Sequence, residues 1–325
     1  MSTPVTPRAG TAAGAARPPA GPAQPPAGGA PAPAGERDAA RDERPLLDQV
    51  LEFAAEKRIT LPVFSDVARQ VQRATRADSY DISEIERAIE SDPALVAEVL
   101  RAANSAFFGG LSEVASIKAA ILRLGLPRVA NLVFLASEKS RYAARTPAIA
   151  GLMKMLWHHA SACALAAEWI ARKVRYPQLG ETVFIGALIH DIGKLFLLRV
   201  LDQMQSAPGA RAVSPELVEE VLRGAHTDVG HRLLAAWNLP DVYQVIVRDH
   251  HNDPLDPANV ALNIVRLANH ASAKVGASLR PDASIELAAL PEASALGISD
   301  VALAELEIVL EDLVADQLGE TLAQG

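Results

Sequence analysis

Residues 184–198, FIGALIHDIGKLFLL, place a histidine and an aspartate side by side within an apolar segment that is otherwise typical of a helix. Apart from Lys194, every other position of this stretch suits burial. The pair His190-Asp191 leaves two interpretations open. It holds a metal ion that cleaves a phosphate ester, or it is a polar remnant in a domain that only binds other molecules.

The composition of the whole chain favours helices over sheets. The chain has 325 residues, of which 50% are apolar and only 4% aromatic. Its core must therefore be built from Ala, Leu, Val and Ile, a mixture that suits helix better than sheet. The length allows one large domain or two ordinary ones.

Cysteine content and hydropathy bear on the compartment. The single cysteine, Cys163, excludes an intramolecular disulfide and fits a reducing cytoplasm. The sequence has no apolar run of about 18 residues, the length of a membrane-spanning helix. The N-terminus also lacks the apolar region of a secretory signal. We therefore expect a cytoplasmic chain without membrane insertion.

The charge balance argues against nucleic acid as a partner. The formal charge is -8, and the first 44 residues carry five Arg against four acidic side chains. The rest of the chain is therefore acidic and would repel a phosphate backbone on average. A local basic pocket remains compatible with this balance.

Four segments are predicted along the chain. Residues 1–35 contain nine Pro, eleven Ala and six Gly with no aromatic residue, so they cannot bury enough surface to offset chain entropy. The predicted segments are a disordered tail at 1–44, an N-terminal helical half at 45–148, a second helical half at 149–275, and a linker with a C-terminal amphipathic helix at 276–325.

Polar residues mark helix starts in the N-terminal half. Asp81 or Ser83 can cap the segment that follows, because short polar side chains accept hydrogen bonds from the first free amides of a helix. Asp92 followed by Pro93 predicts another helix start.

The second half reads as a series of helices separated by Pro and Gly. The expected helices span residues 152–174, 182–201, 214–238, 240–251 and 257–275, and a further one spans 299–318. We find no convincing strand in the sequence, so the predicted fold is all-α.

All eight histidines lie between residues 158 and 270. Taken singly, a histidine on a helix is more often a hydrogen-bonded core or surface residue than a ligand. The set is more informative, because imidazole and carboxylate together suit first-row transition metals. One helix cannot supply a whole site, since neighbouring residues point about 100° apart. The candidate ligands come from four different predicted helices: His159, His190, Asp191, His226, His250 and His251.

The order His, His-Asp, His, His-His is similar to the HD superfamily of metal-dependent phosphohydrolases, especially its HD-GYP branch. The motifs in the first half of the chain are more specific than this order of ligands. They resemble the HDOD family, the HD-related output domain. The resemblance covers roughly residues 46 to 275. The motifs that carry it are Asp92-Pro93-Ala94-Leu95, Ala103-Asn104-Ser105 and His190-Asp191-Ile192-Gly193-Lys194.

This resemblance implies two packed helical subdomains, of which the second is an HD-like bundle. It also implies one or two divalent metal ions, Mn, Fe or Zn, held by the six candidate ligands. Lys194 matches the lysine that follows the doublet in the phosphodiesterases, where it could stabilise phosphate charge or protonate a leaving group.

Two departures from the HD enzymes bear on catalysis. The late aspartate of those enzymes is replaced by Asn269, a neutral and weaker ligand. The segment after His251, NDPLDPAN, also lacks the Gly-Tyr-Pro loop of the HD-GYP branch. Loss of a carboxylate should first weaken a site with two metals, because the carboxylate offsets their mutual repulsion.

We therefore expect a regulatory module of bacterial signal transduction that acts through protein contacts and keeps a possible metal site. The expected partners are components of two-component or cyclic-di-GMP pathways. One alternative is a metal-dependent phosphohydrolase or cyclic-dinucleotide phosphodiesterase in which Lys194 is catalytic. The other is a nucleotide sensor that binds without cleaving.

Overall fold

The structure is a computed structural model that describes residues 45–323, except for 60, 62–65, 76–80, 106–107, 109–112, 208 and 211. The predicted disordered tail, residues 1–44, lies outside the described residues.

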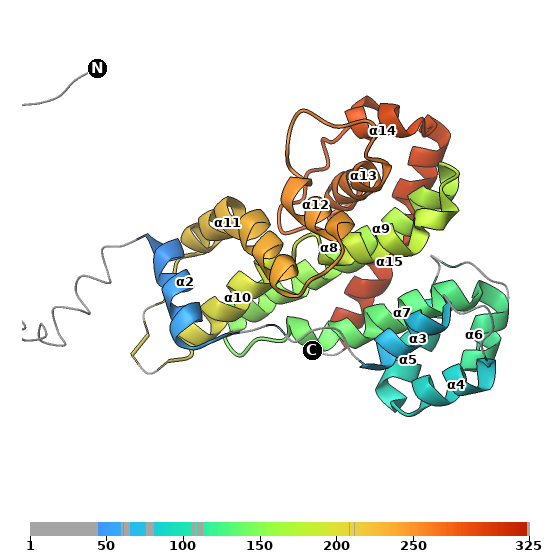
Figure 1. Cartoon of the computed structure of the whole chain (residues 1–325), viewed down its shortest axis with the longest axis horizontal. Coiled ribbons are helices and arrows are strands. Elements are labelled where there is room, and N and C mark those ends of the chain that lie inside the picture. Colours follow the sequence, from blue (N-terminus) through green and yellow to red (C-terminus); the bar gives the residue numbers. More distant parts are fainter. Residues whose placement is uncertain are drawn as a thin grey trace, which may run out of the picture. The chain divides into compact units, whose positions relative to one another are not determined.

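The described part of the chain is helical and contains no strand, which confirms the prediction of an all-α fold (Figure 1). The α-helices are α2 (Leu46–Glu56), α3 (Asp66–Thr75), α4 (Ile82–Glu90), α5 (Pro93–Asn104), α6 (Ile117–Leu124), α7 (Leu126–Glu138), α8 (Pro147–Lys173), α9 (Gly180–Ile189), α10 (Ile192–Gln205), α11 (Pro215–Ala236), α12 (Asp241–Asp249), α13 (Val260–Lys274), α14 (Pro291–Leu296) and α15 (Asp300–Ala323). The short 3-10 helices are η2 (Lys139–Tyr142), η3 (Pro177–Leu179) and η4 (Leu287–Ala289).

Side-chain caps set the starts of α4 and α5 as the sequence indicated. The Asp81 carboxylate accepts a hydrogen bond from the Ser83 amide at 2.8 Å, so Asp81 is the cap of α4. The Asp92 carboxylate accepts from the amides of residues 94 and 95, and Pro93 occupies the first turn of α5. These bonds satisfy amides that have no partner inside the helix.

The described helices form two apolar cores. One core is formed by residues of the helices α3 to α7. The other surrounds α8 and includes residues of α9 to α13 and of α15. Phe108 packs against both cores, which supports the expected arrangement of two packed helical subdomains. Helix α2 joins the second core through its contacts with α10 and α11. The exact segment boundaries stay a prediction.

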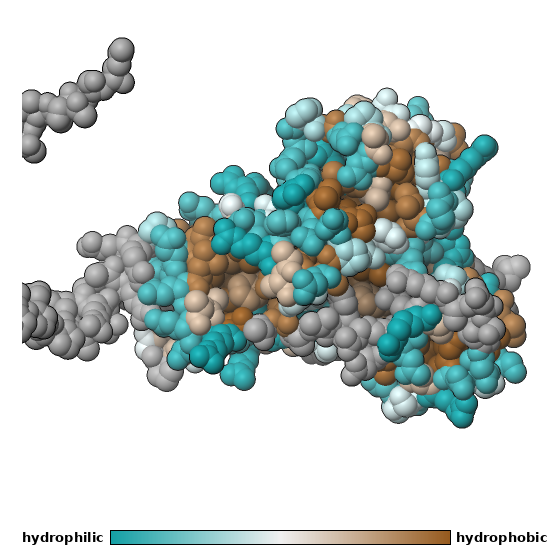
Figure 2. Space-filling view, in the orientation of Figure 1, coloured by the Kyte–Doolittle hydropathy of each residue, from teal (hydrophilic) through white to brown (hydrophobic). Residues whose placement is uncertain are grey.

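Helix α8 is the central element of the second core. It begins with Pro147, whose fixed φ suits a first helical position, and it is buried almost continuously from His159 to Ala171. Its main neighbours are α9 and α13, and α15 and α10 also contact it. The surface is different in character: Figure 2 shows polar residues over most of one face, with apolar ones between them around α11 and α13.

The predicted helix over 182–201 is broken at the His-Asp doublet, so the expectation of one continuous helix was wrong. Helix α9 ends at Ile189, and α10 begins at Ile192. Asp191 has φ -100° and ψ 21°, outside the helical region, and is the N-cap residue of α10. Its carbonyl oxygen accepts hydrogen bonds from the amides of residues 194 and 195. Apolar periodicity alone could not reveal this turn, because both flanking segments are buried helices.

Two glycines allow α10 and α11 to lie in backbone contact. A Cβ atom on Gly193 would lie 1.9 Å from the carbonyl oxygen of His226, and one on Gly230 would lie 3.2 Å from the backbone nitrogen of Gly193. The Gly193 position therefore excludes any side chain. This close approach brings the start of α10 directly against the turn of α11 that carries His226.

A helix that spans a membrane must be both long and apolar. Within the part of the chain that the structure describes, none is both long and apolar enough to cross a bilayer.

We predict that Gly193→Ala destabilises the protein by about 3 kcal/mol or more, because the added methyl group overlaps the backbone of α11 rather than a mobile side chain. Chemical denaturation of the full chain measures this change as a shift in the unfolding midpoint. An unchanged midpoint would show that α10 and α11 do not approach as described.

Gly224→Ala is the matched control, since Gly224 also lies in a helix but a Cβ atom there would meet no atom within 4 Å. This substitution should be neutral or should stabilise the protein by roughly 0.5–1 kcal/mol, because alanine loses less backbone entropy in a helix than glycine.

Candidate metal centre

The structure brings the six side chains singled out in the sequence to one place. His159 comes from α8, His190 and Asp191 from the turn between α9 and α10, and His226 from α11. The pair His250-His251 directly follows α12. All of them are buried except His251, which is exposed at the edge of the cluster.

The four buried histidines share one orientation. In each ring Nδ1 lies within hydrogen-bond distance of a main-chain carbonyl oxygen, which can only accept. Nδ1 therefore carries the proton, and Nε2 presents a free lone pair. The pairs are His159 with Ala277 at 2.8 Å, His190 with Ala187 at 2.7 Å, His226 with Leu222 at 2.8 Å and His250 with Val247 at 3.0 Å.

The free Nε2 atoms meet in two pairs. Nε2 of His159 lies 3.3 Å from Nε2 of His190, and Nε2 of His226 lies 3.3 Å from Nε2 of His250. In their neutral form, with the proton on Nδ1, the rings of each pair have no proton between their Nε2 atoms. Two lone pairs at this distance repel each other unless a cation lies between them.

The Asp191 carboxylate lies between the two nitrogen pairs and adds more acceptors. Its Oδ2 is 3.6 Å from His159 Nε2 and 3.4 Å from His190 Nε2. Its Oδ1 is 3.5 Å from Nε2 of both His226 and His250. Each carboxylate oxygen thus forms a three-atom group with one nitrogen pair.

The two oxygens of Asp191 differ in their partners. Oδ2 accepts a hydrogen bond from Lys194 Nζ at 2.7 Å, whereas Oδ1 is buried and has no hydrogen-bond partner. A buried carboxylate oxygen without a partner is costly. A cation bound beside Oδ1 would remove this cost, so the donor set fits a metal ion.

Burial controls the protonation of the cluster. Burial and the neighbouring His190 lower the pKa of His159 to about 3, and burial lowers the pKa of His226 to about 4. Burial alone would raise the pKa of Asp191, but Lys194 and His190 outweigh it and hold that pKa well below its usual range. At neutral pH His159 and His226 are therefore neutral and the carboxylate is ionised, which are the forms that bind metals.

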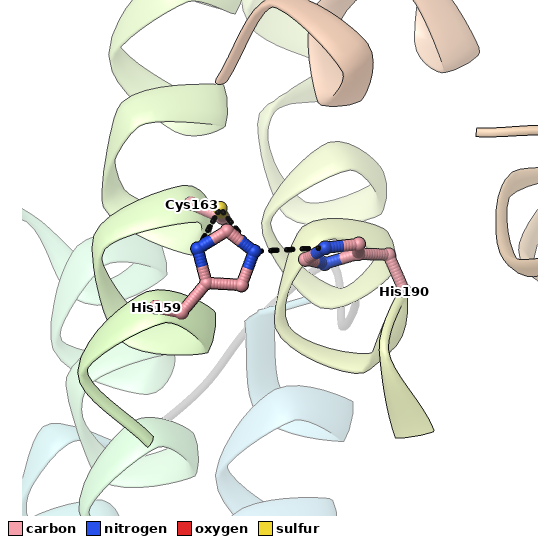
Figure 3. A group of neighbouring side chains, drawn as sticks. All are labelled: His159, Cys163 and His190. Atoms are coloured by element: carbon pink, nitrogen blue, oxygen red, sulfur yellow. Dashed lines mark hydrogen bonds between the residues drawn. The ribbon is translucent and has the colours of Figure 1, made fainter. Parts of the chain in front are cut away.

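Cys163 is part of this neighbourhood, although the sequence had not indicated it. It lies one turn after His159 on α8, and the spacing of four residues is the signal that could have revealed it (Figure 3). Its Sγ is 3.7 Å from both ring nitrogens of His159, so it does not lie along the Nε2 lone pair. The thiol donates towards Ser272 Oγ at 3.4 Å, and burial raises its pKa to about 12. Cys163 therefore packs against a candidate ligand as a neutral thiol.

A cavity of about 590 Å³ opens beside the cluster. Asn269, which stands at the position of the late aspartate in HD enzymes, lines this cavity from α13. Lys194, Arg223 and Arg280 supply positive charge to its wall, and Arg280 is paired with Glu219 at 3.0 Å. The cavity also has an apolar lining, which includes Leu152, Val218, Leu222 and Leu279.

A buried arginine fixes the segment that follows the last histidine pair. Arg266 Nε contacts Glu292 Oε1 at 2.6 Å, and both side chains are buried. The same guanidinium donates to the carbonyl oxygen of Asn252 and pairs with Asp253 at 3.1 Å. Since residue 252 directly follows the last histidine, these bonds restrict where the pair His250-His251 can lie.

The cluster as a whole could bind a divalent first-row metal. It offers neutral imidazole nitrogens and an ionised carboxylate, the ligand types that suit such ions. Each of the four buried histidines is also oriented by a carbonyl oxygen behind it, as is usual for metal-binding imidazoles.

Comparison with known proteins gives both sequence and structural relatives. An uncharacterized protein of Treponema pallidum is 26% identical over 202 residues, which are 61% of this chain and 39% of that protein. The chain thus matches about two fifths of the length of this relative.

Two solved structures share the fold. A Geobacter sulfurreducens HDOD domain protein of unknown function has a TM-score of 0.64 at 20% identity, covering 83% of this chain and 98% of that one. A Shewanella amazonensis protein, provisionally named a metal-dependent phosphohydrolase, has a TM-score of 0.62 at 18% identity, covering 86% of this chain and 99% of that one.

The family model of the HDOD domain matches residues 61–253, more than half of the chain. This range contains most of both helical halves and all six candidate ligands. The chain belongs to the HDOD domain family.

Proposed function

We propose that this chain is a regulatory HDOD module that holds a divalent first-row transition metal in its second helical half. The single observation that carries the metal site is the buried Oδ1 of Asp191, which has no partner and faces two unprotonated imidazole nitrogens. A cation at this place would turn mutual repulsion among acceptors into coordination.

The donor atoms divide into two half-sites that share Asp191. His226 and His250 face Oδ1 with His251 beside them, and this Oδ1 half-site offers the larger number of histidines. The Oδ2 half-site comprises Oδ2, His159 and His190. Mn, Fe and Zn all accept this combination of nitrogen and oxygen donors. Asn269, which lines the adjoining cavity, is neutral, so the centre lacks the late carboxylate that would help to hold a second ion.

The regulatory part of the proposal rests on family membership and on the charge of the chain. HDOD resemblance implies a module of bacterial signal transduction, and the acidic body favours protein partners over nucleic acid. Partners from two-component or cyclic-di-GMP pathways and a cytoplasmic location belong to this proposal.

Hydrolysis of a phosphate ester is the second candidate, favoured by the position of Lys194. Its ammonium group touches Asp191 and also lines the cavity, where Arg223 adds a second cation. A bound metal would lower the pKa of a water ligand towards 7. Lys194 would orient a phosphate group and stabilise its negative charge. The name of the Shewanella protein agrees with this chemistry but was given to another chain.

We predict that the purified full chain binds at least one equivalent of Mn²⁺, Fe²⁺ or Zn²⁺, and that Asp191→Asn weakens this affinity by at least about a hundredfold, since both half-sites use its carboxylate. Metal analysis by mass spectrometry after gentle purification, followed by titration calorimetry, measures the effect. A wild-type chain that binds none of the three metals would refute the metal site.

Two adjacent histidines provide a matched control. His159→Gln removes a candidate ligand, whereas His158→Gln alters its neighbour on α8, which lies outside the cluster. Only His159→Gln should reduce metal binding. Equal losses in both variants would indicate damage to α8 rather than loss of a ligand.

The metal-free protein should lose stability as the pH falls. The folded pKa values of His159 and His226 lie below the ordinary value of 6.5, so between these limits the unfolded state binds more protons than the folded state. The free energy of unfolding should therefore decrease from about pH 6.5 towards pH 4. Denaturation at several pH values tests this, and His159→Gln should make the decline shallower.

His231→Gln serves as the comparison for the pH series, because it alters a histidine of α11 outside the cluster. It should keep the wild-type slope. A flat wild-type profile between these pH values would show that the cluster histidines are not buried in the neutral form.

If the second candidate holds, the Mn²⁺-loaded chain releases product from a phosphomonoester, a phosphodiester or a cyclic dinucleotide. Lys194→Met should then lower kcat by on the order of a hundredfold, as expected for loss of a charge that stabilises phosphate. Absence of turnover with all three substrates would eliminate hydrolysis. Binding without turnover would favour the nucleotide sensor instead.

A further inference from the structure

Lys194 occupies one of the two places where a cation can neutralise Asp191. Its Nζ lies 2.7 Å from Oδ2, the oxygen that also faces His159 and His190. The lysine side chain is 17% exposed and reaches Asp191 from the first turn of α10. Within the described structure, Oδ1 has no equivalent partner. The two half-sites are therefore unequal before any metal binds.

This inequality has an electrostatic consequence for metal loading. A divalent ion at the Oδ1 half-site joins an oxygen without a partner, so nothing has to be displaced. An ion at the Oδ2 half-site would share its oxygen with an ammonium group, and like charges at such a short distance repel strongly in a buried site. The second ion can bind well only if the ammonium group moves away.

The cavity offers Lys194 another place to go. Lys194 and Arg223 line the 590 Å³ space next to the cluster, and Arg280 lines it paired with Glu219. An oxyanion in this space would find the cationic groups of Lys194 and Arg223, and its negative charge would attract the lysine ammonium away from Oδ2. The lysine is flexible enough for this change, because it carries its charge on a four-carbon chain.

We propose that Lys194 is a specificity-determining residue that limits the centre to one metal ion until an oxyanion such as phosphate enters the cavity. In this arrangement the first ion binds at the Oδ1 half-site. The oxyanion then releases Oδ2 from Lys194, and a second ion loads between His159 and His190. Metal stoichiometry thereby reports the presence of an anionic ligand. This inference rests on the metal site proposed above, which it extends to the order and the control of loading.

A simple structural ion pair on α10 is the alternative role for Lys194. The pair spans three residues of one helix turn, and such pairs often serve only local stability. The two roles differ in one measurable property. A structural pair would leave the number of bound metal ions unchanged when the lysine charge is removed, whereas a competing cation would not.

The test is calorimetric titration of the chelator-treated full chain with Mn²⁺, with and without inorganic phosphate. We expect the wild type to bind one equivalent alone and two equivalents with phosphate. Lys194→Met, which keeps the length but removes the charge, should bind two equivalents without phosphate, with the second ion at least about tenfold tighter than in the wild type. Lys194→Arg keeps the charge and should retain the dependence on phosphate.

Electron paramagnetic resonance gives a second readout, because two Mn²⁺ ions that share the Asp191 carboxylate couple magnetically and a single ion does not. Asp191→Asn with phosphate controls for manganese phosphate in solution and should show neither binding nor coupling. Equal stoichiometry and affinity in Lys194→Met and the wild type would overturn the inference while leaving the metal site intact. A chain that binds no Mn²⁺ in any form would overturn both.

Discussion

The arrangement around the Asp191 carboxylate is the constraint on which the second helical half depends. Four imidazoles turn unprotonated nitrogens towards a carboxylate that also only accepts hydrogen bonds. Such a group of acceptors is unfavourable in a buried site unless positive charge is supplied. The protein supplies part of it through Lys194 on Oδ2 and leaves Oδ1 without a partner. The proposed metal site and its unequal halves both follow from this imbalance.

Much of the surrounding fold serves to hold these side chains in place. The turn at Asp191 interrupts a buried helix, and Gly193 then lets α10 touch the backbone of α11 next to His226. Arg266 ties down the segment after His250, using a buried contact with Glu292. The turn at Asp191, the glycine at 193 and the buried Arg266 each lower stability or restrict which residue can occupy that position. Together they position ligands more firmly than loops alone would allow.

The sequence predicted the fold class and six side chains of the cluster, but neither the neighbouring Cys163 nor the geometry. The confinement of all histidines to residues 158–270 and their order with Asp191 indicated one site, because one helix face cannot supply it. The break after Ile189 could not be predicted, since apolar residues continue on both sides of it. The carbonyl partners, such as Ala277, depend on backbone positions far away in the sequence. Residue type alone cannot specify them.

Helix α8 connects the proposed metal centre with the N-terminal half, because it carries His159 and its Glu168 bonds to Asn131 of α7. His159 and Cys163 face the metal cluster, while Trp157 and Leu165 line a separate 380 Å³ cavity with Leu132 of α7. A change in the metal occupancy proposed above would therefore act on a helix that also contacts the N-terminal half. A buried helix with side chains fixed on two faces transmits a shift of one face to the other, because packed interiors are only slightly compressible. Loss of catalytic features such as the late aspartate would then leave a centre whose occupancy, rather than turnover, is the signal.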